Sequence, residues 1–183
     1  KVQDLEVATT VVVRTPAVPQ DMALYVWLRE QGFTILKRAE VLGLITRQQQ
    51  ALCVAGTHGK TTTSTILAHI LHSSHIGTNA FLGGIANNYD TNLLLDAKSN
   101  YVVVEADEFD RSFHHLTPYI SIITSIDPDH LDIYGTEEAY RESFAHYASL
   151  VQEALVVKRD IASRLSPLTS PPHRFYTYAV GEQ

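Results

Sequence analysis

A glycine-rich run at residues 56–63, with the sequence GTHGKTTT, has the residue types expected of a site for a nucleoside triphosphate. A glycine turn in front of a helix lets backbone N–H groups converge on a phosphate, and the helix N-terminus adds partial positive charge. The Lys60 ammonium can reach the β- and γ-phosphates, and the Thr61 hydroxyl can ligate Mg²⁺. The residues expected to bind the nucleotide are Gly56, Thr57, His58, Gly59, Lys60, Thr61 and Thr62.

The spacing of this loop is tighter than that of the commonest phosphate-binding loop, G-x-x-x-x-G-K-[ST]. That pattern would place its first glycine at position 54, where the chain has Val54. A plain glycine turn before an ordinary helix is the alternative interpretation. The apolar run 51–55 before the loop and the helix-like stretch after it favour the phosphate site, because such a motif is expected between a strand and a helix.

Two other apolar runs end in side chains that can take part in chemistry. The run 101–105 ends on Glu105, and the run 119–126 leads into the letters DPDH, which end on His130. Mg²⁺ prefers oxygen ligands and usually keeps several waters, so Glu105 is the best protein ligand besides Thr61. Three more acids follow, and we expect some of them to be structural, capping or orienting neighbours: they are Asp107, Glu108 and Asp110.

The role of any single histidine stays open at this point, because the chain has nine histidines. His130 stands out only through its place at a predicted strand end. His114 and His115 are adjacent and would point to opposite faces of a strand. With a single cysteine in the chain, we do not expect a zinc site.

Strand-like and helix-like segments alternate along most of the chain. Strands are expected at 10–13, 33–36, 51–55, 101–105, 119–126, 154–157 and 174–179. Helices are expected at 21–31, 39–44, 60–71 and 136–150. The segment 73–100 is rich in Gly, Asn and Asp, and we expect it to be loop-like apart from short apolar pieces.

Apolar strands separated by helices predict an α/β fold, with a mostly parallel sheet and flanking helices on both faces. Ligands of such sheets gather at the carboxyl ends of the strands. Gly56, Glu105 and the turn at 127–130 all follow strand ends, so we expect them to lie near one another. Glu105 and His130 should then lie within about 10 Å of the Lys60 turn, close enough for a water-bridged ligand shell.

Composition narrows the class of protein. The 183 residues suffice for one domain, or for one domain plus a fragment, and 45% of them are hydrophobic. A net charge of −6 argues against a general binder of nucleic acid or of membrane surfaces. The single cysteine fits a reducing compartment, and neither a membrane span nor a signal-peptide pattern is visible. We expect a cytoplasmic enzyme.

Together these motifs resemble the Mur ligase family, the ATP-dependent ligases of peptidoglycan precursor synthesis. The resemblance rests on GTHGKTTT at 56–63, EADEFDRSF at 105–113 and DPDHLDIY at 127–134. His58 adds specificity, because the ligases that add later amino acids usually carry Asn there. The strings TPAVP and KRAE, at 15–19 and 37–40, resemble the end of the family's N-terminal domain.

The resemblance implies three domains in a complete family member, which bind the UDP-sugar, ATP and the incoming amino acid. Residues 1–46 are then expected to be the C-terminal part of the UDP-sugar-binding domain, the tail of a Rossmann-like domain. Residues 47–183 are expected to be an incomplete central ATP-binding domain of the P-loop type. The amino-acid-binding domain is expected to be absent, so we expect this fragment alone to have little or no ligase activity.

The resemblance also implies roles for single residues. The implied catalytic residues are Lys60, Glu105 and His130, and the implied Mg²⁺ ligands are Thr61, Glu105 and His130, the last holding a second ion. Ser112 and Phe113 are implied on the side of the sugar substrate. Two departures from the family pattern matter: Ser125 stands where Asn is more usual, and the helix containing 141–146 lacks the lysine that some relatives carry in carbamylated form.

The implied activity is ATP-driven amide formation between the carboxylate of UDP-N-acetylmuramate and L-alanine, through an acyl phosphate, in the bacterial cytoplasm. One alternative is the recycling ligase that attaches a murein tripeptide to the same sugar nucleotide. Another is a nucleotide-binding module without ligase chemistry, whose sequence would lack the pair of Glu105 and His130. We expect no nucleic-acid partner and no membrane insertion, and the sequence leaves the oligomeric state open.

Overall fold

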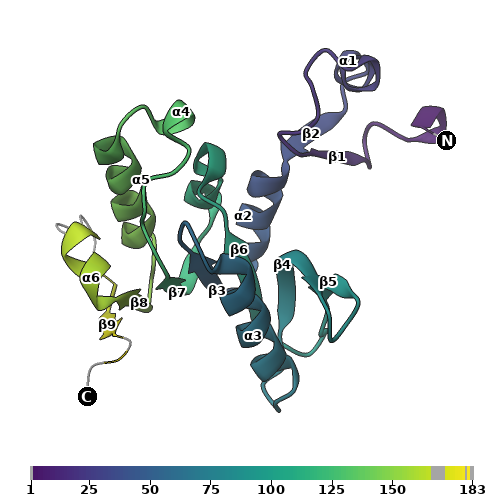
Figure 1. The fold of residues 1–183 in the computed structure, drawn as a ribbon. Coiled ribbons are helices and arrows are strands. Elements are labelled where there is room, and N and C mark those ends of the chain that lie inside the picture. The colour runs from purple at the N-terminus through teal and green to yellow at the C-terminus, as the bar shows by residue number, and fades with distance from the viewer. Residues whose placement is uncertain (1, 166–171, 180, 182–183) are drawn as a thin grey trace.

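The computed structural model describes residues 2–165, 172–179 and 181, which form a small N-terminal unit and a larger body. The small unit contains η1 (Val2–Asp4), the parallel strands β1 (Val11–Arg14) and β2 (Thr34–Lys37), and helix α1 (Ala23–Glu30). Figure 1 shows this unit standing apart from the large sheet, with helix α2 (Arg38–Gln48) running from one to the other. The predicted domain boundary between 46 and 47 therefore falls inside a continuous helix.

The larger body is built on a seven-stranded sheet with the order β5-β4-β6-β3-β7-β8-β9. Its strands are β3 (Gln50–Ala55), β4 (Asn79–Ala86), β5 (Thr91–Leu94), β6 (Tyr101–Ala106), β7 (Pro118–Ile123), β8 (Ala154–Lys158) and β9 (Arg174–Tyr178). Neighbouring strands are parallel, except that β4 and β5 are antiparallel. The predicted α/β fold with a mostly parallel sheet is confirmed, and the carboxyl ends of β6, β3 and β7 lie side by side.

Alternate side chains along the strands divide between two cores, one on each face of the sheet. On one face, Leu52 and Val103 pack with Ala68 of helix α3 (Lys60–His72). On the other face, Cys53 and Val104 join a core that is rich in aromatic side chains. Four fully buried aromatic residues contribute to it: Phe113, Tyr140, Phe144 and Tyr147.

These aromatic residues come from η2 (Phe109–His115) and α5 (Glu137–Ser149). The remaining helical elements are α4 (Leu131–Tyr134), α6 (Arg159–Ala162) and η3 (Ser163–Leu165). Among the described residues, no helix has the length and apolar character needed to span a membrane.

The expectation that residues 73–100 are loop-like is wrong, because β4 and β5 form an antiparallel hairpin there. Gly83 and Gly84 inside β4, and a turn in which Asp90 has a φ of 51°, give this segment the composition of a loop. The pairing of β4 with β6 nevertheless buries Ala80 and Leu82. These tertiary contacts outweigh the weak local preference of the segment for a strand.

Two predicted segments differ from the structure by three or more residues at one end. Helix α2 is longer than the predicted 39–44, since it covers Arg38–Gln48. The predicted strand 119–126 ends earlier, because β7 stops at Ile123. The residues after Ile123 turn instead toward the glycine-rich loop and bind it.

Candidate active site

The loop at residues 56–59 joins the central strand β3 to α3. Gly56 has a φ of 132°, and Gly59, the N-cap of α3, has a φ of 81°, both values that favour glycine. A Cβ on Gly56 would lie 2.8 Å from the backbone nitrogen of Ser125. Glycine therefore lets the loop turn sharply and lie against the segment after β7. The first turn of α3 has no side-chain cap, so its N–H groups suit an anion.

Several hydrogen bonds fasten this loop and the end of β3 to residues 124 and 125. The Thr124 N–H donates to the Ala55 carbonyl at 3.0 Å, and the Thr57 N–H donates to the Ser125 carbonyl at 3.2 Å. The His58 N–H donates to the Ser125 hydroxyl at 2.8 Å, and the Thr124 hydroxyl donates to the His58 carbonyl at 2.5 Å. Ser125, where the family more often has Asn, thus makes a polar contact with the loop itself.

A buried tyrosine also holds the loop. The Thr57 hydroxyl donates to the Asp127 carbonyl and lies 2.8 Å from the hydroxyl of Tyr140. Burial raises the pKa of Tyr140, so its hydroxyl stays protonated and can donate to Thr57. Tyr140 lies in the helix predicted at 136–150, but no local pattern of sequence reveals a contact between residues 83 positions apart.

The predicted partners Thr61 and Glu105 meet. The Thr61 hydroxyl donates to Glu105 Oε1 at 2.8 Å, and the Gly83 N–H donates to Oε2 at 2.8 Å. Glu105 lies near the carboxyl end of β6, directly beside Val54 of β3, which explains why it reaches the start of α3. The two oxygen groups are hard donors of the kind that Mg²⁺ prefers.

These residues fit a Mg²⁺ ion that takes most of its ligands from phosphate and water. Within the described part of the chain, no group of three or more His, Cys, Asp or Glu side chains could form a dedicated metal cage. One carboxylate and one hydroxyl beside a phosphate loop are the donor set usual for magnesium bound with a nucleotide. Thr61 and Glu105 would hold the ion.

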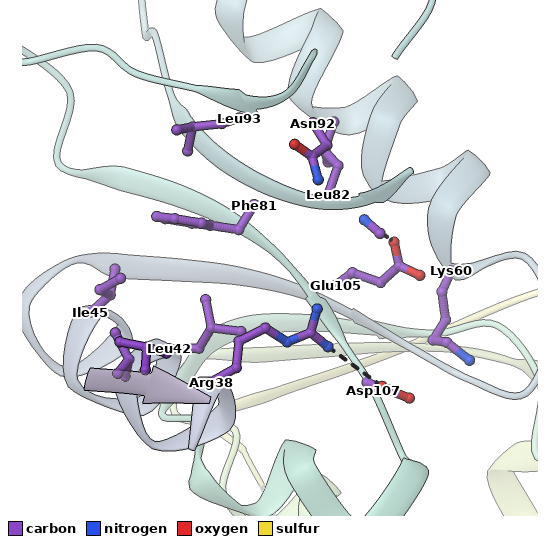
Figure 2. A pocket seen from close by; sticks show the side chains of 13 residues that line it. Arg38, Leu42, Ile45, Lys60, Phe81, Leu82, Asn92, Leu93, Glu105 and Asp107 are labelled. Atoms are coloured by element: carbon purple, nitrogen blue, oxygen red, sulfur yellow. Dashed lines mark hydrogen bonds and ion pairs between the residues drawn. The ribbon is translucent and has the colours of Figure 1, made fainter. Parts of the chain in front are cut away.

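The Lys60 side chain extends away from Glu105 and contacts a different acidic residue, Glu108. Its Nζ lies 2.8 Å from Oε2 and 3.0 Å from Oε1 of Glu108, and 2.7 Å from the Gly56 carbonyl oxygen. Glu108 is only 1% exposed. Figure 2 shows the Lys60 side chain pointing away from the Glu105 carboxylate. The sequence placed Glu108 among the structural or orienting acids, and the structure makes it the direct partner of Lys60.

A cavity of about 510 Å³ opens beside these groups (Figure 2). Lys60 and Glu105 line one part of it, and Arg38 and Asp107, whose charged groups are 3.8 Å apart, supply further polar groups. Its apolar wall comes from α2 and the β4–β5 hairpin, and includes Leu42, Ile45, Phe81 and Leu93. A second cavity of about 450 Å³ lies between the N-terminal unit and η2 and is lined by Ser112.

Two other predicted site residues, His130 and Phe113, pack against aromatic side chains. The ring of His130 packs edge-on against Phe109 at 5.3 Å, and its Nε2 lies 3.9 Å from Asp129. His130 has a φ of 52° at the N-cap of α4, and its role as a metal ligand stays a prediction. Phe113 is a fully buried core residue, stacked on Tyr147 at 4.7 Å, and its place on the side of the sugar substrate stays a prediction.

The sequence profile described as the Mur ligase middle domain matches residues 54–183, which include the loop, the acidic segment and the turn at 127–130. The chain belongs to the Mur ligase family. This membership agrees with the resemblance drawn from the three motifs.

Two relatives of this chain carry the name UDP-N-acetylmuramate–L-alanine ligase. The chain is 60% identical over 177 residues to the UDP-N-acetylmuramate–L-alanine ligase of Phocaeicola vulgatus, covering 96% of this chain and 38% of that protein. It is 57% identical over 176 residues to the same-named ligase of Porphyromonas gingivalis, covering 95% of this chain and 38% of that protein. The chain therefore spans well under half the length of these relatives.

Solved structures share the fold of this Mur ligase chain. The UDP-N-acetylmuramate–alanine ligase of Thermotoga maritima has a TM-score of 0.78 and 28% identity, covering 94% of this chain and 39% of that one. The UDP-N-acetylmuramate:L-alanyl-γ-D-glutamyl-meso-diaminopimelate ligase of Neisseria meningitides has a TM-score of 0.77 and 24% identity, covering 90% and 58%. The second likeness concerns the fold alone.

Proposed function

We propose that this chain is the ATP-binding part of a ligase that joins L-alanine to the carboxylate of UDP-N-acetylmuramate, in peptidoglycan precursor synthesis. The observation that carries the proposal is the 2.8 Å contact between the Thr61 hydroxyl and the Glu105 carboxylate, next to Lys60 at the start of α3. The choice of substrates is supported by relatives that are 60% and 57% identical and carry that name. The proposed setting is the bacterial cytoplasm, which supplies ATP.

The first step must bring two anions together, because a carboxylate oxygen attacks the γ-phosphorus of ATP. The bond to phosphorus forms as the bond to ADP breaks, and ADP leaves with the electron pair. Backbone N–H groups of the loop and the Lys60 ammonium stabilise the charge on the transferring group. A Mg²⁺ ion held by Thr61 and Glu105 would supply further charge neutralisation.

The second step forms the amide. The amine nitrogen of L-alanine bonds to the acyl carbon of the acyl phosphate, inorganic phosphate leaves, and the nitrogen releases a proton. The 510 Å³ cavity supports this scheme, since it opens on Lys60 and Glu105 and can admit the sugar-bound carboxylate. His130 as ligand of a second Mg²⁺ and Ser112 as a contact of the sugar substrate belong to the same proposal.

The test is phosphate release from ATP by the intact protein, measured with UDP-N-acetylmuramate and either L-alanine or the murein tripeptide. Release that requires the sugar nucleotide and L-alanine is expected. Phosphate release that occurs with the tripeptide but not with L-alanine would identify the recycling ligase. Phosphate release or nucleotide binding that does not depend on UDP-N-acetylmuramate would indicate a nucleotide-binding module.

Lys60→Ala tests the assignment of the phosphate site. Because it removes a charge from the transition state, turnover is expected to fall by about 100-fold or more, the loss typical of one electrostatic contact. Near-normal ligation by this variant, measured with the same phosphate-release assay, would contradict the assignment of the site.

A further inference from the structure

Glu108 is the deeply buried acid of the segment 107–110, which also contains Asp107 and Asp110. Its side chain is 2% exposed, against 38% for Asp107 and 48% for Asp110. A carboxylate that has lost its contact with water needs a charged or hydrogen-bonding partner, because an unpaired buried charge is strongly destabilising. The partner here is the Lys60 ammonium, which contacts both carboxylate oxygens.

The Lys60 ammonium has no donor left over in this arrangement. It carries three N–H groups. Besides Glu108, its acceptors are the Gly56 carbonyl at 2.7 Å and the Thr57 carbonyl at 3.4 Å. A phosphate oxygen can therefore accept a hydrogen bond from Lys60 only if one of these acceptors yields. Among these acceptors Glu108 carries a negative charge, as phosphate does, so Glu108 and phosphate compete for the same ammonium.

The position of Glu108 is fixed by its neighbours. The hydroxyl of Tyr134 donates to the Glu108 backbone carbonyl at 2.5 Å. The guanidinium of Arg111 lies over the Tyr134 ring at 4.7 Å, and both Asp110 and Arg111 have positive φ values, of 52° and 54°. These contacts fix the backbone around Glu108, and its side chain, 2% exposed, is held in the site by Lys60.

We propose that Glu108 is an internal counter-ion that competes with the phosphate tail of the nucleotide for Lys60 and so weakens nucleotide binding. The inference rests on the proposed function and deepens it. Phosphate binding draws the ammonium away from a buried carboxylate and brings a second anion close to that carboxylate. Both effects oppose binding, and both assist the departure of ADP after phosphoryl transfer, a step that often limits turnover.

The test compares Mg-ADP binding by the intact wild-type protein and its Glu108→Gln variant, which keeps the size of the side chain and removes its charge. The variant is expected to bind ADP about tenfold more tightly, as expected for removing a like charge at a few ångströms in a partly desolvated site. AMP, which lacks the β-phosphate, should show little of this gain. Asp110→Asn is the matched control: it removes an exposed charge two residues away, and its ADP affinity should stay close to that of the wild type.

An unchanged or weaker affinity of Glu108→Gln, or an equal gain in Asp110→Asn, would overturn the inference. A crystal structure of the wild-type protein with Mg-ADP provides a test that does not depend on the folding of a variant. Lys60 Nζ is expected beyond about 4 Å, the usual limit of an ion pair, from both Glu108 oxygens. Retention of both contacts would overturn the inference. Absence of Mg-ADP binding by the wild-type protein would overturn the proposed function, and the inference with it.

Discussion

The carboxylate of Glu105 lies where a side chain on Gly83 would be. A Cβ on Gly83 would lie between 2.5 and 2.7 Å from the carboxylate atoms of Glu105, too close for any real contact. The N–H of the same glycine donates to that carboxylate at 2.8 Å. A missing side chain and a backbone donor therefore orient the candidate Mg²⁺ ligand toward Thr61.

Gly83→Ala is expected to displace Glu105 and to raise the Mg²⁺ concentration needed for nucleotide binding about tenfold, the scale of losing a group that orients a metal ligand. Gly84→Ala is the matched control, because its Cβ would be no closer than 3.4 Å to its nearest neighbour, Thr61. A Mg²⁺ titration of ADP binding measures both variants. The same Mg²⁺ requirement in both would remove Glu105 from the metal site.

Single residues differ in how far the sequence could predict them. Lys60 and Thr61 belong to a local motif, and Glu105 ends an apolar strand, so residue type and position were enough to predict that Glu105 lies beside the start of α3. The partnership of Lys60 with Glu108 and the contact of Thr57 with Tyr140 join residues 48 and 83 positions apart. No periodicity or spacing reports such contacts, since the fold alone brings these residues together.

At the scale of elements, helix α5 supports the phosphate loop. It begins at Glu137, with the Thr136 side chain accepting from the Ala139 N–H at 3.1 Å, and it packs its aromatic stripe on the sheet. Tyr140 on this stripe reaches past the core to Thr57. The helix therefore connects the packing of the core to the shape of the loop.

Tyr140→Phe is expected to reduce the free energy of unfolding by about 1 kcal/mol, the value of one hydrogen bond, and also to weaken ADP binding severalfold because the loop is less constrained. Tyr147→Phe is the control. Its hydroxyl lies 2.8 Å from Ser121 Oγ in the same core but away from the loop, so only stability should fall. Urea unfolding and ADP titration separate the two effects. Equal ADP affinities in the two variants would argue against a role of α5 in holding the loop.

The strands could be predicted where the sequence contains an uninterrupted run of hydrophobic residues. The central strands β3, β6 and β7 are short apolar runs, α3 follows the glycine-rich loop, and α5 shows helical spacing after the capping residue Thr136. The β4–β5 hairpin was missed because Gly83, which makes room for Glu105, and the adjacent Gly84 weaken the strand propensity of the segment. Its existence depends on pairing with β6, which a local window of sequence does not contain.

At the scale of the whole molecule, buried groups on one side of the sheet make stability depend on pH. Burial raises the pKa of Cys53 from 9.0 to about 12, and burial also raises the pKa of Tyr147. Burial lowers the pKa of His114 from its usual 6.5, with nearby His146 and Arg111 acting in the same direction. The native state thus favours the neutral form of each of these groups.

The signs of these shifts predict a plateau of stability between about pH 6.5 and 9. Below it the unfolded chain binds a proton at His114 more readily than the native state does, so stability falls as the pH drops. Above it the unfolded chain loses the Cys53 proton first, which should cost on the order of 1 kcal/mol at pH 10, one unit above the ordinary pKa of 9.0. Urea unfolding of the chain at pH 5.5, 7.5 and 10 measures both arms. Cys53→Ala, compared with the wild type only through its pH dependence, should weaken the alkaline arm and keep the acid arm, and the part that remains comes from the buried tyrosines whose pKa is raised. The same fall in stability between pH 7.5 and 10 in Cys53→Ala and in the wild type would mean that Cys53 ionises as easily in the folded core as in water.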